Sequence, residues 1–197
     1  MTVTQGQLLW RGFHWAFFIN VQGLIICLRR FEAQIALGQL DQAQTELQTA
    51  TELLLASGAS MELAGSFNRH EYEHSVRQSM TPPQVQADNF SGLMSWEHAA
   101  LMQIWKRLRP TFEQLPAALH PQHQAFVNAY LSLATAHRAV CEKFGGNEGG
   151  SLRFEGGSAV TTLDRFSASR RALIDPHHSA PSGCPVHLST ESKPRDQ

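Results

Sequence analysis

The chain is poor in charged residues, and its charge balance excludes several classes of partner. Charged residues make up 17% of the 197 residues, and the net charge is -1 with neutral histidines. This balance gives no electrostatic attraction to nucleic acid or to an anionic membrane surface. A low charge fraction is typical of a protein whose surface is partly covered by a ligand or by another subunit, so we expect a homo-oligomer.

Regularly spaced cysteines and targeting signals are also missing. The three cysteines, Cys27, Cys141 and Cys184, are an odd number without regular spacing, which excludes a disulfide framework. No basic segment precedes the apolar N-terminal stretch, so the sequence predicts no secretory signal peptide. The most apolar stretch, residues 16–28, is shorter than the roughly 20 residues that a bilayer requires. We therefore expect a cytoplasmic protein without a membrane partner.

No alternating strand pattern is present, and most of the chain has helical periodicity. The sequence predicts helices over residues 8–37, 41–56, 61–80, 95–108, 121–144 and 158–174. The expected fold is therefore all-α, a bundle of about five to six helices in a single domain of residues 1–175. A Pro/Ser/His-rich tail, residues 176–197, has no apolar run with which to fold alone.

A histidine interrupts the apolar face of the fifth predicted helix. The residues that share this face, by steps of three or four, are Phe126, Tyr130, Leu133, His137, Val140 and Phe144. His137 is either a core histidine or a ligand directed into an apolar cavity. The glycine-rich residues 145–151 that follow favour the second interpretation, because such a helix and loop suit a large flat cofactor such as haem. A neutral imidazole can bind haem iron axially.

His14 lies on the apolar face of the first predicted helix, with Phe17 and Val21. One interpretation is a core histidine bonded to a backbone carbonyl. The other is a distal base that faces a cofactor from the side opposite His137.

His70, His74 and Arg77 share one face of the third predicted helix. Arg77 offers two parallel donors for a carboxylate, although a solvated polar face is an equally good interpretation of this residue. For His70 and His74 the solvated polar face is the better interpretation. Glu71 and His74 also form the Glu-x-x-His pattern of di-iron bundles. Because such a centre needs two of these motifs and only one is present, a di-iron enzyme is the weakest hypothesis.

The tail carries a further group of metal-binding residue types, His177, His178, Cys184 and His187. Their spacing matches neither a zinc site nor the Cys-x-x-Cys-His motif of c-type haem attachment. An ordinary tail therefore remains one interpretation. The other is a single thioether between Cys184 and a haem vinyl group.

Several of these segments, taken in order, resemble the haem-dependent aromatic oxygenase superfamily. This superfamily includes tryptophan and indoleamine dioxygenases and the haem-dependent tyrosine hydroxylases. The segments that carry the resemblance are residues 14–17, Arg77 with 90–93, 119–123 with Tyr130, 137–144, and 155–158 with Leu163. The order of residues 80–83, 91–93 and 97–98 is closer to the tyrosine hydroxylases. The chain is shorter than typical relatives, and its glycine loop lacks the usual initial threonine.

The resemblance implies a role for each matching residue. His137 corresponds to the proximal haem ligand, and His14 to the distal histidine. Arg77 and Phe90 correspond to substrate-binding positions, and Gly156, Gly157 and Ser158 to the loop over the substrate. In the tail, His177, His178 and Cys184 resemble the late histidine and haem-bonded cysteine of some tyrosine hydroxylases.

The resemblance also implies an activity. We expect haem-dependent oxidation of an aromatic amino acid of the tyrosine or tryptophan type, with ring hydroxylation by O2 or H2O2 as the main hypothesis. The alternatives are a ring-opening dioxygenase, a non-catalytic haem sensor or carrier, and a helical interaction module without a cofactor. The presence or absence of a haem spectrum separates the last alternative from the others.

Overall fold

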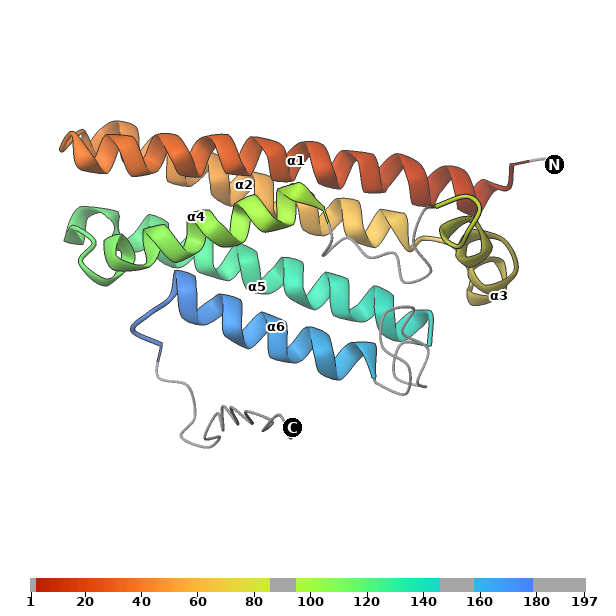
Figure 1. Cartoon of the computed structure of the whole chain (residues 1–197). Helices are drawn as coiled ribbons and strands as arrows, with labels where there is room; N and C mark the ends of the chain where they lie inside the picture. The colour runs from red at the N-terminus through yellow and green to blue at the C-terminus, as the bar shows by residue number, and fades with distance from the viewer. Residues whose placement is uncertain (1–2, 86–94, 146–157, 179–197) are drawn as a thin grey trace, which may run out of the picture.

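The computed structural model describes residues 3–85, 95–145 and 158–178, and within these ranges the protein is helical without strands. Figure 1 shows α1 and α2 beside each other along one side, followed by α4, α5 and, at the other side, α6. The elements are α1 Gln5–Ala36, α2 Leu40–Ala64, α3 Arg69–Glu71, η1 Tyr72–Val76, η2 Arg77–Met80, α4 Trp96–Glu113, η4 Ala117–Leu119, α5 His120–Lys143 and α6 Ala159–Ile174. The all-α bundle expected from the sequence is confirmed.

Local sequence signals explain both ends of α1. The Thr4 hydroxyl accepts a hydrogen bond from the Gln7 amide, and the Gln7 side chain accepts one from the Thr4 amide, which forms a capping box. At the other end, Gly38 adopts a φ of 70°, a conformation that glycine reaches without steric cost. The short turn that results reverses the chain and places α2 antiparallel to α1.

The predicted boundary between the second and third helices is wrong. α2 continues through Ser57 and Gly58 to Ala64, beyond the predicted end at residue 56. Gly58 serves close packing instead, because a Cβ at this position would lie 3.5 Å from the Leu133 Cα of α5. Helix restarts only after Asn68, whose side chain accepts a hydrogen bond from the Glu71 amide.

The segment from residue 69 to residue 80 is helical but irregular. A turn of α-helix is followed by the π-helical turn η1 and the 3-10 turn η2, and the segment ends at Met80 as predicted. Two hydrogen bonds connect this segment to the start of α1. The Gly6 amide donates to Glu71 Oε1 at 2.6 Å, and the Thr4 and Ser75 hydroxyls are 2.9 Å apart.

The three later helices agree with the sequence except at one end. Ser95 caps α4 as predicted, but the helix continues through Pro110 to Glu113. A proline in the last turn removes one backbone donor, and the burial of Phe112 favours the continued helix. α5 and α6 begin and end within a residue of the predicted positions.

The buried residues form two hydrophobic clusters. The larger one joins α1, α2, α4 and α5 around Phe31, Trp105 and Phe126. The smaller one lies where the N-terminal part of α1 meets the C-terminal end of α5, and contains Phe67 and Phe144. In this second region, Trp10 contacts Tyr72 and Phe144 with ring centroids 5.7 and 6.3 Å apart.

By length and composition alone, α1 could cross a membrane. The same test is passed by core helices of soluble proteins, so this is weak evidence. In the protein, its residues Leu24, Leu28 and Phe31 are fully buried against the other helices.

Candidate functional site

His137 lies on α5, one turn before Val140 and Cys141. Its ring is partly buried, and desolvation lowers its pKa to about 4, with smaller contributions from the positive charges of Arg170 and of protonated His14. Among residues 3–85, 95–145 and 158–178, no group forms a hydrogen bond with the His137 ring. His137 is therefore a neutral imidazole with a free acceptor nitrogen at pH 7, the form that binds a metal.

His14 approaches the same region from α1. Its Nδ1 lies 2.8 Å from the Trp10 carbonyl oxygen, and its ring stacks against Trp10 with centroids 4.1 Å apart. Because a carbonyl can only accept, Nδ1 carries the proton and Nε2 is the free acceptor in the neutral ring. Burial lowers the pKa of His14 and so favours this neutral form.

Arg170 and His98 add two groups that the sequence did not indicate. Arg170 comes from α6, and its Nη2 lies 3.4 Å from Nε2 of His98, at the start of α4. The guanidinium also lies beside the Tyr130 hydroxyl on α5, and burial lowers its pKa. Because the charge of Arg170 also acts on His137, the structure brings side chains of α1, α4, α5 and α6 together around one region.

A hollow of about 260 Å³ opens beside His14, between α1 and the start of α4. It is lined by Arg11, His14, Trp15, Phe18, Ser95 and Glu97. Glu97 is buried, and its Oε1 accepts a hydrogen bond of 3.0 Å from the Gln22 amide group. Aromatic walls with a few polar groups are typical of small-molecule sites.

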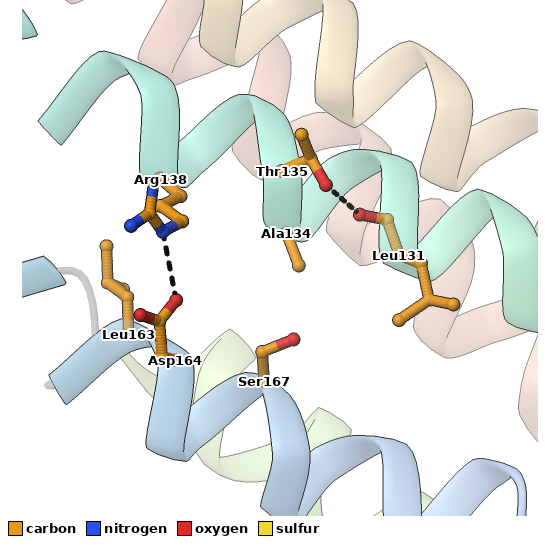
Figure 2. Close-up of a pocket in the computed structure, with 7 residues that line it drawn as sticks. All are labelled: Leu131, Ala134, Thr135, Arg138, Leu163, Asp164 and Ser167. Atoms are coloured by element: carbon orange, nitrogen blue, oxygen red, sulfur yellow. Dashed lines mark hydrogen bonds and ion pairs between the residues drawn. The ribbon is translucent and has the colours of Figure 1, made fainter. Parts of the chain in front are cut away.

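A second hollow, of about 140 Å³, separates α5 from α6 (Figure 2). The ion pair between Arg138 Nε and Asp164 Oδ1, 3.1 Å apart, closes one side of it. It contains no histidine or cysteine, and it is smaller than the hollow at His14. We therefore place the candidate site on the His14 side of the bundle.

The substrate-binding residues expected from the resemblance do not come together in the described ranges. Arg77 lies in η2, where its charge acts on Tyr72 at the edge of the smaller cluster. Ser158 caps α6, its hydroxyl accepting from the Thr161 amide. Phe90, Gly156 and Gly157 lie outside the described residues, so their predicted roles stay predictions.

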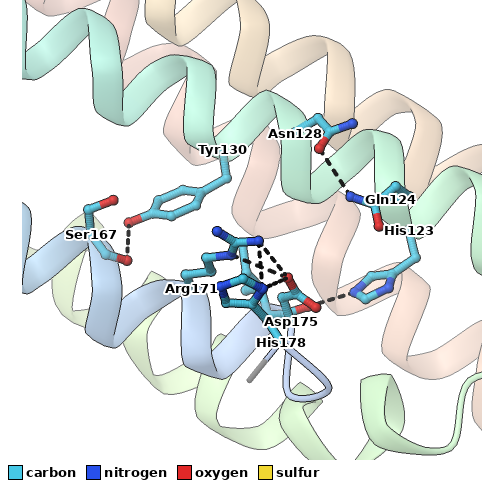
Figure 3. A network of polar contacts seen from close by, with 9 residues as sticks. His123, Gln124, Asn128, Tyr130, Ser167, Arg171, Asp175 and His178 are labelled. Atoms are coloured by element: carbon cyan, nitrogen blue, oxygen red, sulfur yellow. Dashed lines mark hydrogen bonds and ion pairs between the residues drawn. The ribbon is translucent and has the colours of Figure 1, made fainter. Parts of the chain in front are cut away.

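The structure separates the tail histidines from His137. His177 Nε2 lies 3.0 Å from the Glu113 carbonyl oxygen, and His178 Nδ1 lies 2.9 Å from Arg171 Nη2. Figure 3 shows His178 in a polar network with Asp175 near His123, at the other end of α5. Fourteen residues of helix between His123 and His137 correspond to roughly 21 Å. This placement does not favour a role for His177 or His178 at a cofactor bound to His137, and Cys184 lies outside the described residues.

Cys141 is a free, partly buried thiol near His137. It follows His137 by four residues on α5, and this spacing places both side chains on one side of the helix. Burial raises the pKa of Cys141 to about 11, so the group is a neutral thiol at pH 7. The His-x-x-x-Cys spacing is visible in the sequence and could have identified the pair.

The remaining metal hypothesis gains no support. Within the part of the chain that the structure describes, no three His, Cys, Asp or Glu side chains are grouped to hold a metal ion. His70 and His74 stack on each other at the surface, and Glu71 accepts the Gly6 amide. A di-iron centre at these residues is therefore not indicated.

The fold and the site define a class: a helical bundle with neutral histidines from separate helices around a partly buried ligand region. Comparison with known proteins gives the family. A sequence model described as SfmD 3-methyl-L-tyrosine peroxygenase matches residues 2–147, and the chain belongs to this family.

A curated relative, the 3-methyl-L-tyrosine peroxygenase of Streptomyces lavendulae, is 26% identical over 179 residues. The alignment covers 89% of this chain and 49% of the relative, so the chain spans about half the length of that protein. No solved structure matches the chain. The family agrees with the expected oxidation of an aromatic amino acid, whereas membership of the wider dioxygenase superfamily stays a prediction.

Proposed function

We propose that this chain binds haem through His137 and takes part in the peroxide-dependent oxidation of an aromatic amino acid. The observation that carries the proposal is the state of His137, a neutral, partly buried imidazole without a hydrogen-bond partner in the described ranges. The relative's name supports a tyrosine-type substrate and a peroxide as oxidant.

The donor set fits a haem. An imidazole whose pKa is about 4 has no proton to lose before it binds iron at pH 7. His14 and His98, on α1 and α4, supply imidazoles from other elements, and Trp10 and Phe17 supply apolar surface. Haem, when bound, supplies the oxidising chemistry, and the protein supplies binding, orientation and the exclusion of water.

The hydrogen bonds of the site assign proton-transfer roles to its histidines. His14 holds its proton at Nδ1 against the Trp10 carbonyl, so its Nε2 can accept a proton from a peroxide and later return it. In this tautomer His14 would act as a base before it acts as an acid. His98 accepts from Arg170 at Nε2, because a guanidinium only donates. In this arrangement His14 keeps a free acceptor nitrogen at Nε2, whereas Nε2 of His98 is engaged by Arg170.

Covalent attachment of the haem has two candidate thiols. The tail cysteine Cys184 follows from the resemblance, and Cys141 follows from its position one turn after His137 on the same side of α5. A thioether is formed by addition of a thiol across a vinyl group. Acid–acetone extraction of the holoprotein distinguishes the two: only replacement of the attached cysteine by alanine should release the haem.

A haem sensor or carrier is the second candidate function. Two imidazoles from separate helices, His14 and His137, could together hold a haem that carries out no oxidation. An unchanged Soret band on addition of an aromatic amino acid or peroxide would favour it. Ring-opening dioxygenation and a homo-oligomer also stay predictions, which product analysis and light scattering would test.

The direct test is haem titration of the full chain. We expect the wild type to give a Soret band shifted from that of free haem, and His137→Ala to lose it. His74→Ala is the matched control, because His74 is an exposed histidine on another element. A colourless wild type after titration, or a band that survives in His137→Ala, would contradict the proposal.

A further inference from the structure

Arg170 is a partly buried cation without an acidic partner among the residues that the structure describes. Other arginines form surface ion pairs, among them Arg107 with Glu32 at 2.9 Å and Arg171 with Asp175 at 3.3 Å. In the described ranges, Arg170 has no carboxylate within ion-pair distance, and desolvation lowers its pKa.

The neighbours of Arg170 hold it in position but leave its charge uncompensated. They are the Nε2 atom of His98 at 3.4 Å, the Tyr130 hydroxyl and the Phe166 ring, whose centroid lies 5.2 Å from the guanidinium carbon. The phenol and the phenyl ring carry no charge, and His98 is the acceptor at Nε2 in its contact with the guanidinium. A cation withdrawn from water without a counterion costs free energy, and a bound anion removes that cost.

Tyr130, whose hydroxyl the guanidinium contacts, lies two helical turns before His137 on the same face of α5. The planar fork of the guanidinium matches the two oxygens of a carboxylate. We infer that Arg170 binds a carboxylate of the ligand held at His137, and that His98 and Tyr130 keep its guanidinium oriented for this contact. The inference rests on the proposed function, and the carboxylate belongs either to a haem propionate or to the aromatic amino acid.

The other arginines fit this role less well. Arg171, the next residue, is paired with Asp175. Arg77 lies beside Tyr72 at the smaller cluster, away from His98. Arg165 is exposed on the same helix as Arg170, so it serves as a control that removes one positive charge from α6 without touching the site.

The test compares Arg170→Met, Arg170→Lys and the control Arg165→Met, each as the full chain. Haem and haem dimethyl ester are titrated by absorbance, and L-tyrosine and tyramine, which lacks the carboxylate, are titrated into the haem-loaded protein by calorimetry. We expect Arg170→Met to weaken the binding of one carboxylate ligand, either haem or L-tyrosine, about tenfold or more. Binding of its counterpart without the free carboxylate, haem dimethyl ester or tyramine, should be unchanged. The Lys variant keeps the charge but loses the fork, so we expect an intermediate loss.

Each outcome has one meaning. A loss confined to haem assigns the propionate as the partner of Arg170, and a loss confined to L-tyrosine assigns the amino acid. If neither pair changes relative to Arg165→Met, the inference is wrong. If Arg170→Met does not fold, equal affinities of wild type and Arg170→Lys for both acids would overturn it in the same way. A wild type that binds no haem contradicts the proposed function, while the tyrosine and tyramine comparison on that protein still tests Arg170.

Discussion

Replacement of His137 by glutamine should remove most of an acid-induced loss of stability. His137 has an ordinary pKa of 6.5 in the unfolded chain and about 4 in the folded protein. Between these values the unfolded chain binds more protons, so its stability relative to the folded state increases as the pH falls. The two pKa values give a contribution close to zero above pH 7, about 2 kcal/mol of destabilisation at pH 5 and about 3 kcal/mol at pH 4.

Urea unfolding of the haem-free protein, monitored by far-UV circular dichroism at several pH values from 4 to 7.5, measures this contribution. The wild type should lose about 2 kcal/mol more than His137→Gln between pH 7 and pH 5. His14 and His123 also have lowered pKa values, but they titrate in both proteins and largely cancel in the comparison. Parallel stability profiles for the two proteins would show that His137 is solvated in the folded state, and would refute the assignment of a neutral, desolvated ligand.

Substitutions at three further positions test packing and ligand contacts. Gly58→Ala should stabilise the protein by about 0.5–1 kcal/mol, because its new methyl group meets Leu133 at an ordinary contact distance. Gly58→Val should cost about 1–3 kcal/mol, and equal Tm values for the two variants would contradict this reasoning. His123→Leu should cost about 1–2 kcal/mol, measured by urea unfolding, because it removes the 2.6 Å contact to the Ile174 carbonyl. Arg77→Ala should leave tyrosine affinity in calorimetry unchanged; a large loss would assign the carboxylate to Arg77.

The sequence was sufficient for the fold class and for most helix boundaries, because apolar periodicity and capping residues are local signals. Thr4, Ser95 and Ser158 all cap helices within a few residues of the predicted starts. The errors arose where tertiary packing overrides a local signal. The second helix was predicted to end at residue 56, but it continues past Gly58, where a small residue lets α5 pack against α2. This contact with Leu133 is invisible in the sequence around residue 58.

The site was predicted only in part, for the same physical reason. Helical periodicity showed that His14 and His137 face the interior, because a residue's face depends on its own helix. The partners across the interior depend on the packing of separate helices. Arg170 and His98 are 72 residues apart, and no spacing rule within one helix relates them. Cys141 is different, since its spacing from His137 is local and was available in the sequence.

The origin of each site residue also bears on specificity. The family match covers residues 2–147, which include His14, His98, His137 and Cys141. Arg170 comes from α6, beyond that range, and it contacts His98 and lies beside Tyr130 inside it. If the family segment supplies the imidazoles, then α6 adds the positive charge that selects among ligands.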